Sequence, residues 1–120
     1  MKKIKKKKKF IYLISPNTIN NKIFFKDLES IFSTKKIAFF QLRLKKYSKK
    51  KIISIGKKIK KLCNKYNVKL IINDDPRIAK NLNADGCHIG QKDIGIKQAR
   101  KIFKNKIISI TCHNSKKLIK

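Results

Sequence analysis

The stretch around Leu70 to Asp93 constrains the fold more than any other part of the sequence. An apolar run from Val68 to Ile72 predicts a strand that is buried on both faces, and a second run from Gly86 to Ile89 predicts another. Between the two runs, Pro76 suits the first turn of a short helix. A strand, a helix and a strand in this order predict a βαβ unit with parallel strands.

The rest of the chain repeats this alternation. Apolar, β-branched runs predict three more strands, at Phe10 to Ile14, Ile37 to Leu42 and Ile107 to Thr111. Apolar residues at helical spacing predict helices at Ile23 to Phe32, at Ser48 (as N-cap) to Tyr66, and at Ile96 to Phe103. No GxGxxG or Walker loop follows the first strand. We therefore expect an α/β fold of the TIM type, an incomplete (β/α) barrel of about five parallel strands over residues 10–120, after a lysine-rich tail at residues 1–9.

The composition is strongly basic. Lys+Arg 34 against Asp+Glu 6 gives a formal charge of +28, which favours binding to polyanions such as nucleic acid. However, lysine, isoleucine and asparagine are over-used together, as an AT-rich gene would produce, and most of the lysines fall on polar helix faces. We interpret the charge as compositional drift and consider nucleic acid an unlikely partner. The alternative to an enzyme is a non-enzymatic basic protein that binds nucleic acid.

The cysteines and the hydropathy pattern indicate the compartment. The three cysteines, Cys63, Cys87 and Cys112, are odd in number and widely spaced, so they predict neither a disulfide framework nor a metal site. No apolar stretch approaches the length that crosses a bilayer. We expect a protein of the reducing cytoplasm that does not enter a membrane.

Polar residues gather where the predicted strands end. Gln41, Arg43 and Lys45 alternate, so on an extended strand end they would point to one side and offer an amide and two cations to an anion. Asp74 and Asp93 each follow a strand, and the carboxyl ends of parallel strands share one rim. Two carboxylates near cations suit Mg²⁺, which also takes substrate phosphates as ligands. The alternative for each aspartate is that it only caps a helix.

These segments, in their order and spacing, resemble the thiamine phosphate synthase/thiazole tautomerase superfamily. The resemblance is carried by YLIS (12–15), QLRLK (41–45), LIINDDPRIA (70–79), ADGCHIGQKD (84–93) and IISITCH (107–113). It implies a TIM-type barrel enzyme, a Mg²⁺-dependent transferase that joins hydroxymethylpyrimidine diphosphate to thiazole phosphate in thiamine biosynthesis. By this resemblance Gln41, Arg43, Lys45 and Asn73 bind the pyrimidine diphosphate, Asp74 and Asp93 hold Mg²⁺, and Thr111 stands where the family usually has serine.

The sequence also departs from the family pattern. Leu44 replaces a usual acidic residue, and a whole barrel needs roughly 200 residues or more. A truncated inactive relative and a thiazole tautomerase-like protein are therefore alternatives, although a tautomerase would be expected to lack the two rim aspartates. We also expect open barrel edges that leave Phe10, Tyr12, Ile108 and Ile110 partly uncovered and that permit homo-oligomers.

Overall fold

The computed structural model describes residues 10–90, 96–102 and 106–110. Within them, five strands form one sheet in which every neighbouring pair is parallel. The strands lie side by side in chain order: β1 (Ile11–Ile14), β2 (Ile37–Leu42), β3 (Lys69–Asn73), β4 (Gly86–Ile89) and β5 (Ile107–Ile110). All five predicted strands are confirmed, with bounds that differ by at most one residue where the chain is described.

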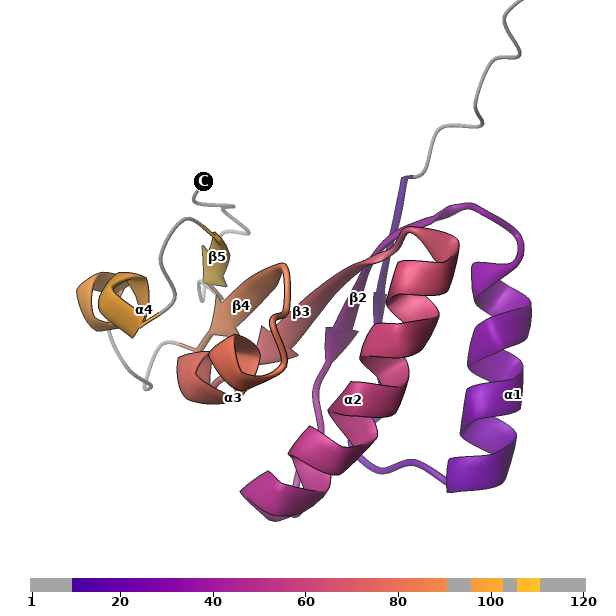
Figure 1. The fold of residues 1–120 in the computed structure, drawn as a ribbon, viewed down its shortest axis with the longest axis horizontal. Coiled ribbons are helices and arrows are strands. Elements are labelled where there is room, and N and C mark those ends of the chain that lie inside the picture. The colour runs from indigo at the N-terminus through magenta and orange to yellow at the C-terminus, as the bar shows by residue number, and fades with distance from the viewer. Residues whose placement is uncertain (1–9, 91–95, 103–105, 111–120) are drawn as a thin grey trace, which may run out of the picture.

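Four helices connect the strands: α1 (Asn21–Phe32), α2 (Lys49–Tyr66), α3 (Pro76–Asn81) and α4 (Ile96–Ile102). All four contribute buried side chains to one apolar cluster on the same face of the sheet, and Figure 1 shows α1 and α2 side by side over β1 and β2. A doubly wound sheet carries helices on both faces and reverses its strand order, whereas a (β/α) barrel does neither. The fold is therefore an incomplete barrel, as the sequence predicts.

The helix ends are set by local hydrogen bonds. Ser48 caps α2, where its Oγ accepts a hydrogen bond from the Lys51 amide at 3.1 Å. Asp75 caps α3, where its Oδ1 accepts from the Arg77 amide at 2.9 Å, and Pro76 occupies the first turn. The helix-capping role that was an alternative for Asp74 thus belongs to its neighbour Asp75.

The apolar cluster lies between the helices and the sheet. Phe32 of α1 meets Phe40 of β2 edge to face, with ring centroids 5.7 Å apart, and both are almost completely buried. Gly56 looks like a weak point of α2 in the sequence, but an added Cβ there would collide with the Leu82 side chain after α3. The glycine therefore permits the close approach of α2 to that segment.

The opposite face of the sheet has no helix over it among the described residues. Phe10 and Tyr12 are exposed at 73% and 40%, as expected for open edges. The expectation for Ile108 is wrong: it is 2% exposed because it faces the helices, and its neighbour Ile107 is exposed at 41% instead. The lysine tail, Phe103, Thr111 and the side chain of Ile110 lie outside the described residues. No helix in the described ranges is long and apolar enough to span a membrane.

Candidate active site at the carboxyl ends of the strands

The loops that follow β1 and β2 are joined by hydrogen bonds. The Ser15 hydroxyl, which is almost buried, accepts from the Arg43 amide at 2.8 Å, and the Lys45 amide donates to the Asn17 carbonyl at 2.9 Å. The Tyr47 hydroxyl accepts from the Ile19 amide at 3.2 Å. These bonds fix the backbone of the segment that carries Arg43 and Lys45.

Gln41 is held on the sheet face opposite the apolar cluster. Its side chain is 3% exposed, and its Nε2 donates to the Tyr12 hydroxyl at 3.0 Å. The Tyr12 ring stacks on Phe39, with 5.5 Å between centroids. Because the amide NH₂ is engaged by Tyr12, the orientation of Gln41 is set before any ligand arrives.

Arg43 and Lys45 lie just beyond the end of β2, whose bounds agree with the predicted strand. β2 ends at Leu42, and the next residues form a loop in which Lys46 has a φ of 66°. The alternation of buried and exposed side chains continues up to this point, because Leu42 and Leu44 are buried in the apolar cluster, whereas Arg43 between them is exposed. Lys45 contacts Asp74, just beyond the end of β3.

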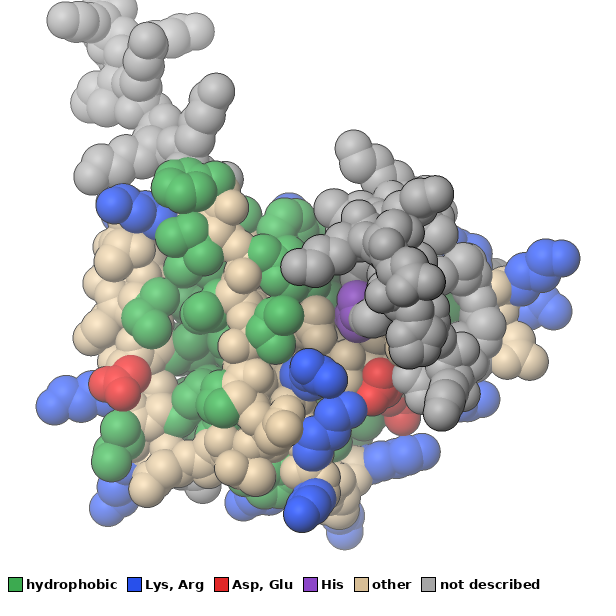
Figure 2. Space-filling view, turned by 180° about the vertical axis from the view of Figure 1, so that it is seen from behind, with side chains coloured by type: hydrophobic (Ala, Val, Ile, Leu, Met, Phe, Trp, Pro, Cys, Tyr) green, Lys and Arg blue, Asp and Glu red, His purple; other side chains and the backbone are tan. Residues whose placement is uncertain are grey.

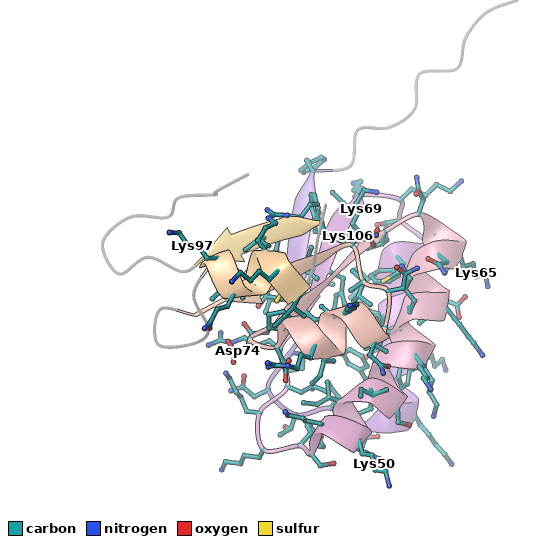
Figure 3. All side chains as sticks on the ribbon, turned by 60° about the vertical axis from the view of Figure 1, so that its left-hand side comes forward. Lys50, Lys65, Lys69, Asp74, Lys97 and Lys106 are labelled. Carbon is teal, nitrogen blue, oxygen red and sulfur yellow. The ribbon has the colours of Figure 1, made fainter. Side chains whose placement is uncertain are left out.

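Asp74 stands just beyond β3 with an uncommon backbone conformation. Its φ is 72°, a region that Asp and Asn tolerate better than most residues, and its amide donates to the His88 carbonyl of β4 at 2.7 Å. Lys45 Nζ lies 3.2 Å from Asp74 Oδ2, and the two side chains are 41% and 39% exposed. In Figure 3, Asp74 lies at the opposite end of the sheet from Lys69, where β3 begins.

A second lysine–aspartate ion pair involves the residue next to Asp74. Lys49 Nζ of α2 lies 3.7 Å from Oδ2 of Asp75, the cap of α3. The loop after β2 and the start of α2 are thus each joined to the loop after β3 by a lysine–aspartate contact. Both pairs are at the surface, so they contribute little to stability and their lysines can exchange a carboxylate for another anion at small cost.

His88 lies on the same face as Asn73, its partner in the sheet. Burial lowers the pKa of His88, the positive charge of Arg43 acts in the same direction, and the negative charge of Asp74 opposes both. A neutral imidazole is therefore favoured beside these two charged groups. Sequence reasoning assigned no site role to His88, Tyr12, Ser15 or Tyr47, because nothing in the local pattern shows that they meet the rim.

The carboxylate of Asp74 is a suitable ligand for a hard cation. It is partly exposed at the rim, and Mg²⁺ prefers such oxygens together with water and phosphate. Within the described residues, no group of three or more His, Cys, Asp or Glu side chains meets. Asp93 and Thr111 lie outside the described ranges, so their placement beside Asp74 stays a prediction.

The family model for thiamine monophosphate synthase matches residues 11–120. The chain belongs to this family. It is 62% identical over 120 residues to a thiamine-phosphate synthase of Pelagibacter ubique, a match that covers 100% of this chain and 58% of the relative. A thiamine-phosphate synthase of Staphylococcus epidermidis is 44% identical over 85 residues, which cover 67% of this chain and 39% of the relative.

Among solved structures, the fold is similar to that of a thiamine phosphate pyrophosphorylase from Pyrococcus furiosus. The TM-score is 0.72 at 23% sequence identity, and the match covers 82% of this chain and 48% of that one. The family assignment and the incomplete barrel therefore agree. This family member spans about half the length of the proteins that it matches.

Proposed function

We propose that the chain forms the pyrimidine-diphosphate half-site of a thiamine phosphate synthase. This transferase activity joins hydroxymethylpyrimidine diphosphate to thiazole phosphate and gives thiamine phosphate and pyrophosphate, in thiamine biosynthesis. Its substrates are small soluble molecules, so we place the protein in the cytoplasm.

The observation that carries the proposal is the meeting of Lys45 and Asp74 across the rim, at 3.2 Å. The two residues are 29 positions apart and belong to two of the five segments that carry the family resemblance. Hydrogen bonds to Ser15 and Asn17 hold the segment that carries Lys45. The hydrogen bond from the Asp74 amide to the His88 carbonyl of β4 holds Asp74. A basic group and a carboxylate are thereby presented together, as a metal diphosphate requires.

The chemistry needs stabilisation of a leaving group more than it needs a protein nucleophile. As pyrophosphate departs from the pyrimidine methylene, negative charge grows on its oxygens, to which Arg43 and Lys45 donate charged hydrogen bonds. The thiazole nitrogen then attacks the electron-poor methylene carbon. Gln41 and Asn73 supply neutral amides that orient the pyrimidine diphosphate, and Thr111 supplies a hydroxyl.

Mg²⁺ fits the oxygen donors of this rim. Asp74, with Asp93, would hold the ion, which when bound neutralises charge on the diphosphate. Lys45 would then exchange its contact with Asp74 for a phosphate oxygen. Because the pair is exposed, little stability is lost in this exchange.

The test is calorimetric titration of the chain with hydroxymethylpyrimidine diphosphate and Mg²⁺. Lys45→Ala should weaken binding by about tenfold or more, because a charged hydrogen bond contributes about 1.5–3 kcal/mol. The matched control is Lys50→Ala, which removes the same group from the exposed side of α2 and should leave binding unchanged. Equal effects of the two substitutions would mean that only the overall positive charge attracts the ligand.

Turnover is the second measurement. Asp93→Ala should abolish any thiamine phosphate formation that is measured when both substrates and Mg²⁺ are supplied. Asp27→Ala, which removes an exposed carboxylate from α1, should not. Product formation that survives Asp93→Ala would contradict the assignment of this residue to the metal.

A further inference from the structure

The side-chain amide of Gln41 lies among apolar neighbours. Its partners in the strand register are Ile14 of β1 and Ile71 of β3. Figure 2 shows hydrophobic side chains gathered over the middle of this sheet face, with charged side chains toward its borders. Because Gln41 is only 3% exposed, its polar atoms need partners within the fold, and the Tyr12 hydroxyl lies 3.0 Å from Nε2.

Tyr12 is itself held in place by packing. It pairs with Phe39 in the parallel register, and the two rings stack with 5.5 Å between their centroids and 25° between their planes. The Tyr12 hydroxyl accepts the hydrogen bond, so it binds the NH₂ group of Gln41 and not the carbonyl oxygen. This contact decides which polar atom of the amide remains for a ligand.

The remaining atom is Gln41 Oε1, which can only accept hydrogen bonds. The oxygen and the nitrogen lie on opposite sides of the amide carbon, so Oε1 faces away from Tyr12. No described residue donates to Oε1, and no buried side-chain oxygen or nitrogen in the described ranges lacks a partner, so this atom keeps contact with solvent. A ligand that meets Oε1 must offer an N–H group, because a carbonyl would place two acceptors against each other.

We propose that Tyr12 is a positioning residue that sets the ligand selectivity of Gln41. By holding the NH₂ group, it presents Oε1 to the pyrimidine ring, and the site selects a ring with an amino group at this edge over one with an oxo group. Without the hydroxyl, the amide can turn over and donate to the oxo group, so the selectivity is lost. This inference rests on the proposed function, because it takes Gln41 to face the pyrimidine of that substrate.

The test is calorimetric titration of the chain, with Mg²⁺, against two hydroxymethylpyrimidine diphosphates that differ in one ring substituent, an amino or an oxo group. Both carry the same diphosphate, so the difference in affinity reports the ring edge alone. The unchanged chain should prefer the amino compound by about 100-fold, since an oxo group leaves Oε1 against a second acceptor. Tyr12→Phe keeps the ring that stacks on Phe39 and should reduce this preference to about threefold or less.

Tyr66→Phe is the matched control. It removes a hydroxyl that donates to Glu29 Oε2 at 2.7 Å, between α2 and α1, and it should leave the preference as in the unchanged chain. A Gln41→Ala background separates positioning from direct contact with the ligand. There, Tyr12→Phe should have no further effect on either affinity, because Tyr12 acts through Gln41. Thermal unfolding of each variant checks its folding.

The outcomes separate this inference from the proposed function. An undiminished preference in Tyr12→Phe, the same loss in Tyr66→Phe, or an effect of Tyr12→Phe that persists in the Gln41→Ala background would overturn the role of Tyr12. An unchanged chain that binds both compounds equally would also overturn it and would leave the proposed function standing. A chain that binds neither compound would overturn both proposals, since it would have no pyrimidine site.

Discussion

The two ends of the sheet use the same residue type in different ways. At the amino end, Asp85 Oδ2 accepts a hydrogen bond from the Leu70 amide at 2.8 Å and lies 3.8 Å from Lys60 Nζ, with 27% of the side chain exposed. At the carboxyl end, Asp74 has a left-handed backbone, 39% side-chain exposure and a surface contact with Lys45. Asp85 accepts a hydrogen bond from the backbone of β3, whereas the Asp74 carboxylate is partly exposed at the rim, where we propose that it binds a cation.

This difference follows the general division of labour in (β/α) barrels. Residues at the carboxyl ends of the strands serve function, and residues at the amino ends serve stability. Asp74 also carries the backbone strain that functional sites retain when the surroundings hold it in place. The difference between the two aspartates can therefore be tested by substitution at each end.

The largest effect is expected for Asp74→Asn. It should reduce the affinity for hydroxymethylpyrimidine diphosphate with Mg²⁺ by tenfold or more, because a hard cation loses a charged ligand. The melting temperature should stay unchanged, because Asn tolerates a positive φ as well as Asp does. Calorimetry and thermal unfolding of the same sample measure both quantities. A lower melting temperature without a change in affinity would mean that Asp74 stabilises the fold and does not bind the ligand.

Asp85→Ala should lower the stability of the fold and leave the ligand affinity unchanged. It leaves the Leu70 amide without its acceptor, which costs about 1–3 kcal/mol of unfolding free energy. In a domain of this size each kcal/mol lowers the melting temperature by about 4–8 °C. Asp85→Asn is the control, since it retains an acceptor oxygen and removes only the charge, and it should cost less. Ligand affinity should be the same in both variants as in the unchanged chain.

The sequence predicts the elements well and the site geometry only in part. Periodicity locates each strand and helix because burial on one face imposes it, and the cap Ser48 and the first-turn residue Pro76 define helix starts. The ion pair between Lys45 and Asp74 is not visible in the pattern, because it joins residues that are 29 positions apart. Which isoleucine of β5 faces the helices also depends on strand register, and a shift of one residue exchanges Ile107 and Ile108.

The roles of Asp85 and Ser15 could not be predicted for a related reason. Each binds a backbone amide that is distant along the chain: Leu70 for Asp85 and Arg43 for Ser15. Such contacts appear only when the sheet brings neighbouring loops together. Local sequence therefore identifies the polar residues at strand ends, while tertiary structure decides which of them support the backbone and which face a ligand.

His88 makes the carboxyl end sensitive to acid. Because its pKa is lowered in the folded state, the unfolded chain binds a proton first as the pH falls. The stability contribution is fully present above the unfolded value of about 6.5 and is lost as the pH falls through the lower folded pKa. Thermal unfolding between pH 7.5 and 5 should show this loss, and His88→Gln should reduce it. An unchanged pH dependence in His88→Gln would mean that other groups cause it.

The smallest change is expected in a test of Cys63 reactivity, because we expect no alkylation of this thiol in the folded chain. Cys63 lies near Lys60 and Asp85, toward the amino end of the sheet. Burial raises the pKa of this thiol to about 12, and its side chain is 0% exposed. At pH 8 roughly one thiol in ten thousand would then be ionised, and the thiolate is the reactive form. Iodoacetamide followed by mass mapping should find Cys63 unmodified in the folded chain and modified in urea. Rapid native modification would show that the segment around Asp85 opens readily, contrary to the stabilising role assigned to that end of the sheet.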